Sequence, residues 1–218
     1  PTAHANLEKH YTLLQDLLIP NGLTAGNFAG TLNGRKHMLH GFTVTGSTLS
    51  NEGSFKSISG TVQNLEFANI MLSASTSGSL LAIVTPVNTG TLNNIKIWSG
   101  EVIGTNDIGA IAGSNQGILS NASVRNVNVQ GHYVTGGLVG YNEGPSASIF
   151  KSEFIGKLGL HPISLAAPIE STGGLVGMNE GSIATSSYAG SFDPAANWSG
   201  QVLLKFGFIV GENATGAT

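Results

Sequence analysis

Two glutamates, Glu143 and Glu180, occupy the same place in two nearly identical nine-residue segments of this sequence. If the segments stack as adjacent turns, the carboxylates lie roughly 5 Å apart, which is the spacing between neighbouring strands. Two carboxylates that face each other across a groove are the arrangement that hydrolyses glycosidic bonds. The glutamates lie in a turn, however, and Gln116 and Ala214 hold this place in other copies. We therefore interpret them as a solvated turn pair, with a cation site or a catalytic pair as the alternative.

His37 and His40 are further candidates for chemistry, because histidines close in the sequence can share a metal ion. Arg35 and Lys36 precede them and no carboxylate is nearby in the sequence, so we interpret both as surface residues. The chain has no HExxH zinc motif, no GxSxG nucleophile motif and no phosphate-binding loop ending in Lys-Ser or Lys-Thr. The sequence therefore predicts no catalytic residue, no metal site and no cofactor.

Side chains that could bind a sugar or a receptor lie in two segments that interrupt the regular pattern of the chain. One segment holds Asp193, Asn197 and Trp198, and the other, residues 157–170, contains His161 and two prolines. An aromatic ring can stack on a sugar while Asp and Asn side chains bond its hydroxyls. These four residues are our binding candidates. The alternative is that both segments only fold over the open edge of the core.

Composition excludes several classes of protein. A chain of 218 residues with 40% hydrophobic and 10% charged residues is too apolar to be disordered and can fill one core. The net charge of −3 and the nine scattered basic residues leave no basic stripe for nucleic acid. No apolar run approaches the roughly 20 residues of a membrane-spanning helix. The absence of cysteine excludes disulfides. We expect neither a nucleic-acid partner nor membrane insertion.

Repetition dominates the sequence. Residues 136–144, GGLVGYNEG, return as residues 173–181, GGLVGMNEG, and weaker copies occupy residues 109–117 and 207–213. Still weaker copies precede them. In each copy a small residue closes the apolar pair and marks the repeat. These markers lie at unequal intervals along the chain: Ser57, Ala82, Gly113, Gly140, Gly177 and Gly211. Intervals that vary through insertions are typical of a solenoid with loops of different length.

Short alternating segments separate the glycine-rich copies, for example residues 61–67, 92–98 and 123–129. Each has one apolar and one polar face, which predicts half-buried strands. Stacking equivalent strands of successive repeats gives a parallel β-helix. The apolar residues of the glycine-rich copies would then stack in the core, with the flanking glycines at tight corners: Ile111, Leu138, Leu175 and Ile209.

Four asparagines recur at one place in successive copies: Asn115, Asn142, Asn179 and Asn213. Aligned asparagines can bond to one another up the stack and tolerate the left-handed backbone of a corner. We interpret them as a structural ladder, and a ligand-binding row is the alternative.

Residues 1–19 differ from the rest of the chain. Leu7, Tyr11, Leu14 and Leu18 follow helical spacing, although residues 11–19 fit a strand equally well. A solenoid needs an atypical terminal element, so we interpret residues 1–19 as an N-terminal cap. Residues 20–218 are predicted to form a single β-helical domain of about six to seven coils, as a fragment of a longer protein.

The unit GGLVGxNEG, followed in the second copy by residues 181–186, GSIATS, resembles the GLUG motif of bacterial secreted and surface proteins. Residues 11–17 and 28–39 are also similar to the stretch that precedes such repeats. The resemblance implies a right-handed parallel β-helix from an adhesin, a filamentous-haemagglutinin-like protein or the non-catalytic region of an immunoglobulin A-cleaving peptidase. It implies no single activity and no catalytic motif.

These observations predict a non-catalytic structural and adhesive segment of a secreted or surface-exposed bacterial protein. Its partners would be a host receptor, a glycan or an extracellular-matrix component, and its open end could associate with another copy. The competing hypothesis is a polysaccharide-acting β-helix enzyme, which requires a lateral groove lined by at least two carboxylates.

Overall fold

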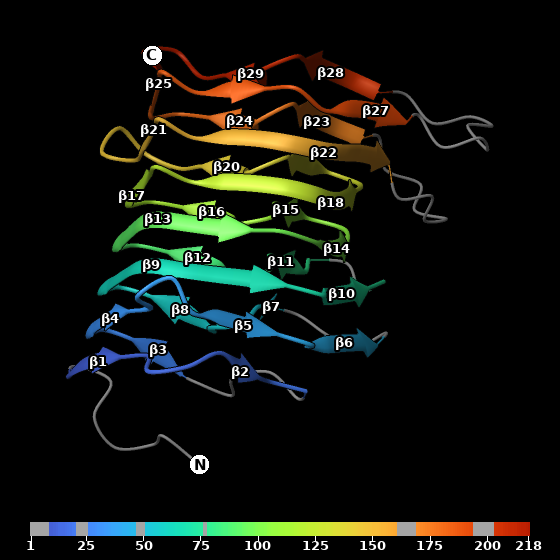
Figure 1. The fold of residues 1–218 in the computed structure, drawn as a ribbon. Coiled ribbons are helices and arrows are strands. Elements are labelled where there is room, and N and C mark those ends of the chain that lie inside the picture. The colour runs from blue at the N-terminus through green and yellow to red at the C-terminus, as the bar shows by residue number, and fades with distance from the viewer. Residues whose placement is uncertain (1–8, 21–25, 47–50, 76–77, 161–168, 194–202) are drawn as a thin grey trace.

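The structure, a computed structural model, describes residues 9–20, 26–46, 51–75, 78–160, 169–193 and 203–218. These ranges contain strands and no helix, so nothing in them forms a helix able to span a membrane. The strands pair in parallel and form three sheets, called A, B and C, in each of which strands from successive turns stack along the solenoid axis (Figure 1). In each turn the chain passes through these sheets in the order A, C, B, and in the described residues sheet B contains seven strands. The predicted all-β parallel solenoid is confirmed.

Sheet A has sixteen strands: β1 (His10–Thr12), β2 (Leu17–Leu18), β4 (Thr31–Asn33), β5 (Met38–His40), β6 (Thr43–Gly46), β9 (Thr61–Ala68), β10 (Ile70–Ala74), β13 (Thr91–Ile97), β14 (Gly100–Ile103), β17 (Ile118–Ser120), β18 (Ser123–Gly131), β21 (Ser148–Phe150), β22 (Glu153–Leu160), β25 (Ser182–Ala184), β26 (Ser187–Tyr188) and β27 (Ser191–Asp193). Sheet B contains β3 (Asn27–Phe28), β8 (Ser57–Ile58), β12 (Thr85–Asn88), β16 (Ala112–Asn115), β20 (Val139–Asn142), β24 (Val176–Asn179) and β29 (Val210–Asn213). Sheet C contains β7 (Asn51–Glu52), β11 (Leu80–Leu81), β15 (Asp107–Ile108), β19 (Val134–Gly136), β23 (Ile169–Gly173) and β28 (Leu203–Gly207).

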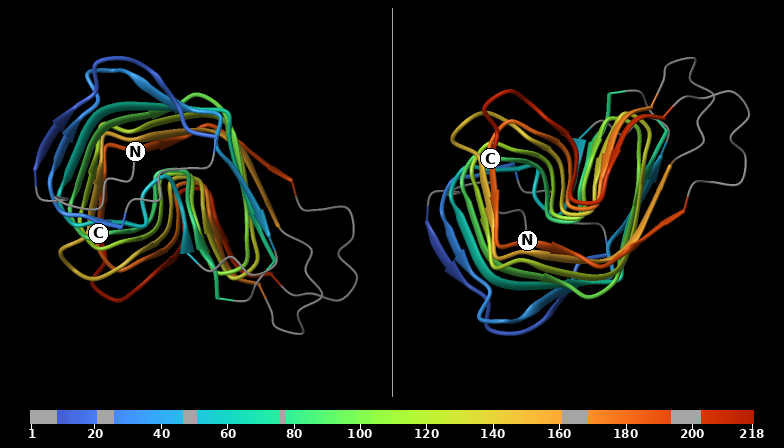
Figure 2. Two further views of the ribbon diagram at one scale, coloured as in Figure 1. Left: turned by 90° about the horizontal axis from the view of Figure 1, so that it is seen from below. Right: turned by 90° about the horizontal axis from the view of Figure 1, so that it is seen from above.

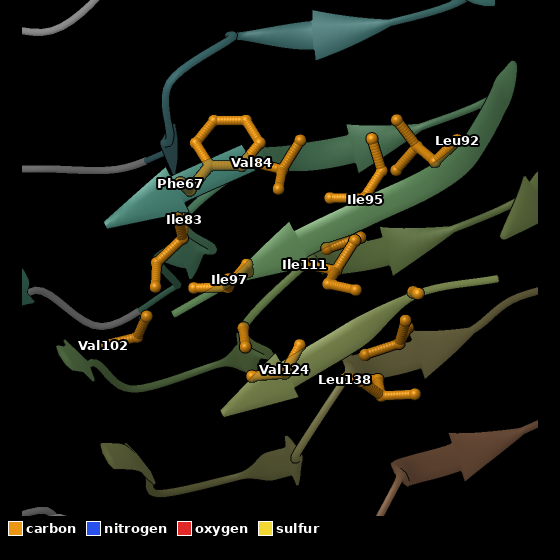
Figure 3. Packing of buried hydrophobic residues seen from close by; sticks show 14 of the residues in the cluster. Phe67, Ile83, Val84, Leu92, Ile95, Ile97, Val102, Ile111, Val124 and Leu138 are labelled. Carbon is orange, nitrogen blue, oxygen red and sulfur yellow. The ribbon is translucent and has the colours of Figure 1, made fainter. Parts of the chain in front are cut away.

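Alternation explains why these short segments become strands around a closed core. In β13, Leu92, Ile95 and Ile97 are fully or almost fully buried, while the residues between them are half-buried. Ile97 pairs in register with Phe67 of the preceding turn and Val124 of the following turn, so equivalent side chains stack from turn to turn (Figure 3). Burying one such side chain stabilises the fold by about 1.5–3 kcal/mol.

The register fixes the length of each turn and corrects the first two repeat markers. One position of sheet B runs through Phe28, Ile58, Asn88, Asn115, Asn142, Asn179 and Asn213, and the longest turn lies between Asn142 and Asn179. Thr85 pairs with Ala112, so Pro86, not Ala82, is the equivalent of Gly113. By the same register Lys56, not Ser57, is the equivalent of Gly113 in the turn before that. The error arose because Leu80 and Leu81 are an apolar pair of sheet C, one element earlier in the turn.

The recurring glycines hold sheets B and C close together. Seen along the axis, the outline of the solenoid is indented on one side (Figure 2). A Cβ on Gly140 would lie 2.6 Å from the backbone N of Ile108, and a Cβ on Gly177 would lie 2.7 Å from the backbone N of Thr135. A Cβ on Gly136 would lie 1.9 Å from the carbonyl oxygen of Val139. The predicted tight corner is therefore the place where a strand of sheet C turns back into sheet B, and side chains have no room there.

The apolar residues of the glycine-rich segment fill the core side of this corner. Ile111, Leu138 and Leu175 are fully buried, whereas Ile209 in the last turn is 40% exposed. Figure 3 shows Val84, Ile111 and Leu138 from three successive turns. The backbone N of Ile111 donates to the carbonyl of Leu138, which places these residues one above the other.

The asparagines form a hydrogen-bonded ladder beside this corner. Each carboxamide nitrogen donates to the carboxamide oxygen one turn higher: Asn88 to Asn115 at 2.7 Å, Asn115 to Asn142 at 2.7 Å, Asn142 to Asn179 at 2.7 Å and Asn179 to Asn213 at 3.0 Å. The nitrogen of Asn115 also donates to the carbonyl of Gly117 at 3.2 Å, which ties the ladder to the turn. The ladder therefore has one more member, Asn88, than the sequence predicted.

The described part of the N-terminal segment is extended. Tyr11 of β1 pairs with Leu32, and Leu17 of β2 pairs with Leu39, so these residues add two short parallel strands to sheet A. The strand interpretation of this segment therefore holds and the helical one is wrong. Leu14 and Leu18 remain exposed at this end of the solenoid.

Candidate binding groove

A column of five different side chains runs along the outside of sheet A. Met71, Glu101, Asn128, Lys157 and Ser191 pair in register on the successive strands β10, β14, β18, β22 and β27. These strands lie one above another at the right of Figure 1. Because neighbouring strands are about 4.8 Å apart, the column extends over roughly 19 Å parallel to the solenoid axis.

This column lines a groove with a volume of about 850 Å³. Besides the column, the lining consists of backbone and side chains from one bend of sheet A: Asn69, Gly100, Asn126, Val127, Ile155, Gly156, Ala189 and Gly190. Carboxamides, one carboxylate, one ammonium group and one hydroxyl thus surround a partly apolar surface. Met71, at one end of the column, is 47% exposed.

Asparagine and glycine shape the bend that forms the groove. Asn69 and Asn126 have φ values of 53° and 51°, in the left-handed region that asparagine tolerates better than most residues. In the next two turns Gly156 and Gly190 lie at the bend, directly before Lys157 and Ser191. A Cβ would lie 2.4 Å from the carbonyl oxygen of Val127 at Gly156 and 2.5 Å from that of Gly156 at Gly190. Without side chains at these positions, the strands can turn sharply and leave a continuous hollow.

Hydrogen bonds fix the polar groups of the groove. The carboxamide nitrogen of Asn128 donates to Oε1 of Glu101 at 2.7 Å, and the hydroxyl of Ser99 donates to the carboxamide oxygen of Asn69 at 3.0 Å. A carboxylate has about four acceptor sites, so Glu101 can accept further hydrogen bonds from a ligand. Glu101 and Lys157 are oppositely charged, and the lining of this groove therefore carries no net formal charge.

An exposed tryptophan contacts a groove residue through its backbone. Trp98 is 41% exposed, and its carbonyl accepts a hydrogen bond from the side chain of Asn126 at 3.4 Å. The indole Nε1 donates to Oε2 of Glu66 at 2.6 Å, and the ammonium group of Lys96 lies 5.8 Å from the ring centroid. These contacts hold the ring in one orientation beside the bend.

The predicted glutamate pair is engaged between turns. Oε2 of Glu143 accepts hydrogen bonds from the hydroxyl of Ser114 at 2.9 Å and from the side chain of Gln116 at 2.8 Å. Glu180 accepts from the hydroxyl of Tyr141 and from the backbone N of Gly144. Burial, and then the hydrogen bond to Glu180, raise the pKa of Tyr141 above its ordinary value. Each carboxylate therefore bonds to the turn below it, which fits the structural interpretation of the pair.

The structure corrects the surroundings of His37. Oδ1 of Asp16 lies 3.2 Å from Nδ1 of His37, although Asp16 precedes His37 by 21 positions. The same oxygen accepts a hydrogen bond of 2.9 Å from the backbone N of Met38. That backbone bond, and then His37, lower the pKa of Asp16. Asp16 is distant in the sequence and comes close to His37 in space because β2 pairs in parallel with β5. Within the described ranges, no three His, Cys, Asp or Glu side chains are arranged to hold a metal ion.

Of the four binding candidates, only Asp193 lies in the described part of the chain. It is exposed and ends β27, shortly after Ser191 of the groove. His161, Asn197 and Trp198 lie outside the described residues. His161 directly follows Leu160, the last residue of β22, so both candidate segments leave from strands that line the groove.

The groove was not predicted from the sequence because the five residues of its column are five different amino acids. The column appears only when residues are spaced by the true turn lengths, which differ from turn to turn between Met71 and Ser191. A usable signal was present in the form Asn-x-Gly, which recurs at Asn88, Asn115, Asn142 and Asn179. That spacing would have corrected the early markers and set the register.

No protein-family model and no curated protein matches the chain. Among solved structures, the fold is similar to that of a protein from Bacteroides ovatus described as a "putative immunoglobulin A1 protease". The TM-score is 0.61 at 17% sequence identity, and the match covers 94% of this chain and 78% of the other. At this identity the likeness shows the fold. The similarity to the GLUG motif stays a prediction from the sequence.

Proposed function

We propose that this chain is a non-catalytic structural segment of an exported bacterial surface protein, which acts as a rigid rod and displays a binding surface. The observation that carries the proposal is the continuity of the internal ladders. Asparagine bonds join five successive positions of sheet B, and a single buried cluster extends from Ile19 to Val176. Such continuous packing resists bending along the axis, as a spacer requires.

The nature of the structural neighbour supports an exported location. A protease of immunoglobulin A1 acts outside the cell, and the neighbour that carries this description has the same solenoid architecture. The groove supports a non-catalytic role, because its lining contains one carboxylate, Glu101, where glycoside hydrolysis uses two.

Surface labelling tests this function. Antibodies raised against the purified chain should bind intact cells of the source organism, and protease treatment of those cells should remove the signal. Labelling that appears only after the cells are permeabilised would contradict an exported location.

We further propose Asp193, Asn197, Trp198 and His161 as contact residues for a host receptor, a glycan or a matrix component. A glycan array that compares the native protein with Trp198→Ala tests this contact. Unchanged binding by the variant would remove the aromatic ring from the proposal.

End-to-end association is a second proposed contact. Sheets B and C end at β29 and β28, whose outer edges have no partner strand among the described residues, and Phe208 beside them is 77% exposed. Sedimentation of native protein and Phe208→Ser should show concentration-dependent association that the variant loses. Monomeric native protein at high concentration would contradict this contact.

A further inference from the structure

We infer that the groove along Met71, Glu101, Asn128, Lys157 and Ser191 binds an uncharged oligosaccharide that lies parallel to the solenoid axis. The inference adds a site on the sheet itself to the proposed rod, and it rests on that proposal only for the absence of catalysis. The shape is the first argument. A hollow of about 850 Å³ that spans five strands is long and open, which fits a chain-like ligand better than a compact one.

The chemistry of the lining is the second argument. Sugar rings present hydroxyls at their edges and C–H groups on their faces, so a site for them needs paired polar groups beside an apolar surface. The carboxylate of Glu101 and the carboxamide of Asn128 lie side by side, bonded at 2.7 Å, and offer adjacent acceptors and a donor to neighbouring hydroxyls. Met71 and Ile155 provide the apolar surface.

Charge selects an uncharged ligand. The single carboxylate of Glu101 offsets the single ammonium group of Lys157, so a polyanion would meet as much repulsion as attraction along the groove. The whole chain carries a net charge of −3, which gives no long-range attraction for acidic polymers.

The backbone pairing disfavours an extended peptide. Peptides that add to a sheet bond to the unpaired backbone of an edge strand. Strands β10, β14, β18 and β22 each pair with a neighbour on both sides. Along these four strands the groove therefore offers mainly side chains, which suits recognition of hydroxyl groups.

A glycan array with the intact chain tests the inference. We expect retention of one or more uncharged oligosaccharides, followed by calorimetry on the best of them. Ser191→Trp places a large side chain in the groove from an exposed position and should abolish binding. Ser187→Trp is the matched control, because Ser187 is also exposed, lies shortly before Ser191 in β26 and is outside the groove lining.

Glu101→Gln provides a second variant that keeps the shape of the groove and the bond to Asn128. It should weaken binding by about tenfold, as expected for loss of a charged hydrogen-bond acceptor. Thermal unfolding of every variant shows whether the fold is intact.

Several results would overturn the inference: retention of acidic glycans alone, binding of extended peptides in place of glycans, no glycan retained, or equal binding by native protein and Ser191→Trp. Chromatography of the bound glycan separates this inference from the proposed function. Intact glycan supports both, whereas cleaved glycan would contradict the non-catalytic role and leave the groove assignment standing. An absence of any glycan binding would leave the rod proposal standing.

Discussion

The corner between sheets C and B and the groove on sheet A are built on the same stacked turns but use sequence in opposite ways. At the corner, residue type repeats, with Gly140 above Gly113 and Asn142 above Asn115. In the groove, the column changes from Glu101 to Asn128 to Lys157 while the backbone register continues. Repetition therefore marks the positions that shape the corner in the later turns, whereas the first turns have Lys56 and Pro86 in place of the glycine. Variation in a regular column marks a surface whose side chains can differ from turn to turn without changing the fold.

The largest effect is expected at the corner glycines. In Gly140→Val the new side chain would overlap the backbone of Asp107 and Ile108, which cannot move without separating two sheets. We expect a loss of at least about 4 kcal/mol in the free energy of unfolding, or failure to fold. Denaturant unfolding measures it, with Ala184→Val at an exposed strand position as the control. Equal stability of the two variants would show that the corner is not tightly closed.

The next effect concerns the apolar ladder behind the glycines. Leu138→Ala leaves a cavity in a fully buried column and should cost about 2–5 kcal/mol. Ile209→Ala removes a side chain of the same column at the 40% exposed end, so its cost should be clearly smaller. A comparison of the two unfolding curves tests whether the column is one continuous core. Similar losses at both positions would contradict the difference in burial.

The asparagine ladder should show the same dependence on position. Asn142→Ala removes a donor to Asn179 and an acceptor for Asn115 inside the core, and we expect a loss of about 2–4 kcal/mol. Asn213→Ala removes one acceptor at an exposed end and should cost less than about 1 kcal/mol. Thermal unfolding of both variants measures the difference. If Asn142→Ala unfolds at nearly the same temperature as the native protein, the ladder contributes little to stability.

The smallest effect is a pH dependence on the outer face of sheet A. The hydroxyl of Ser123, and then Arg125, lower the pKa of Glu153 below its ordinary value near 4.5. Because the folded pKa is the lower one, the stabilisation is present above that ordinary value and is lost as pH falls through the folded pKa. Glu153 is partly exposed, so we expect less than about 1 kcal/mol. Glu153→Gln should reduce the loss of thermal stability on acidification, and an unchanged pH profile would contradict this contact.

The features predicted from the sequence are those that repeat. The glycines at the corner, the stacked Leu138 and the asparagine ladder follow from identical residues at one place in each copy. Asn88 was missed because the copies were matched by their glycine-rich segments and its turn has Pro86 in place of the glycine, although the Asn-x-Gly spacing is present there. The contact of Asp16 with His37 and the groove were not predicted, because both depend on the register between residues of unrelated type.

The contrast between ladder and groove can be measured directly on the asparagine side chains. Nuclear magnetic resonance resolves carboxamide N–H signals, which can be followed while an oligosaccharide selected on the array is added to the native protein. We predict that the signals of Asn69, Asn126 and Asn128 shift with added glycan, whereas those of the buried Asn115 and Asn142 stay fixed. Shifts confined to the ladder, or no shift in the groove at saturating glycan, would contradict the assignment of binding to the variable column.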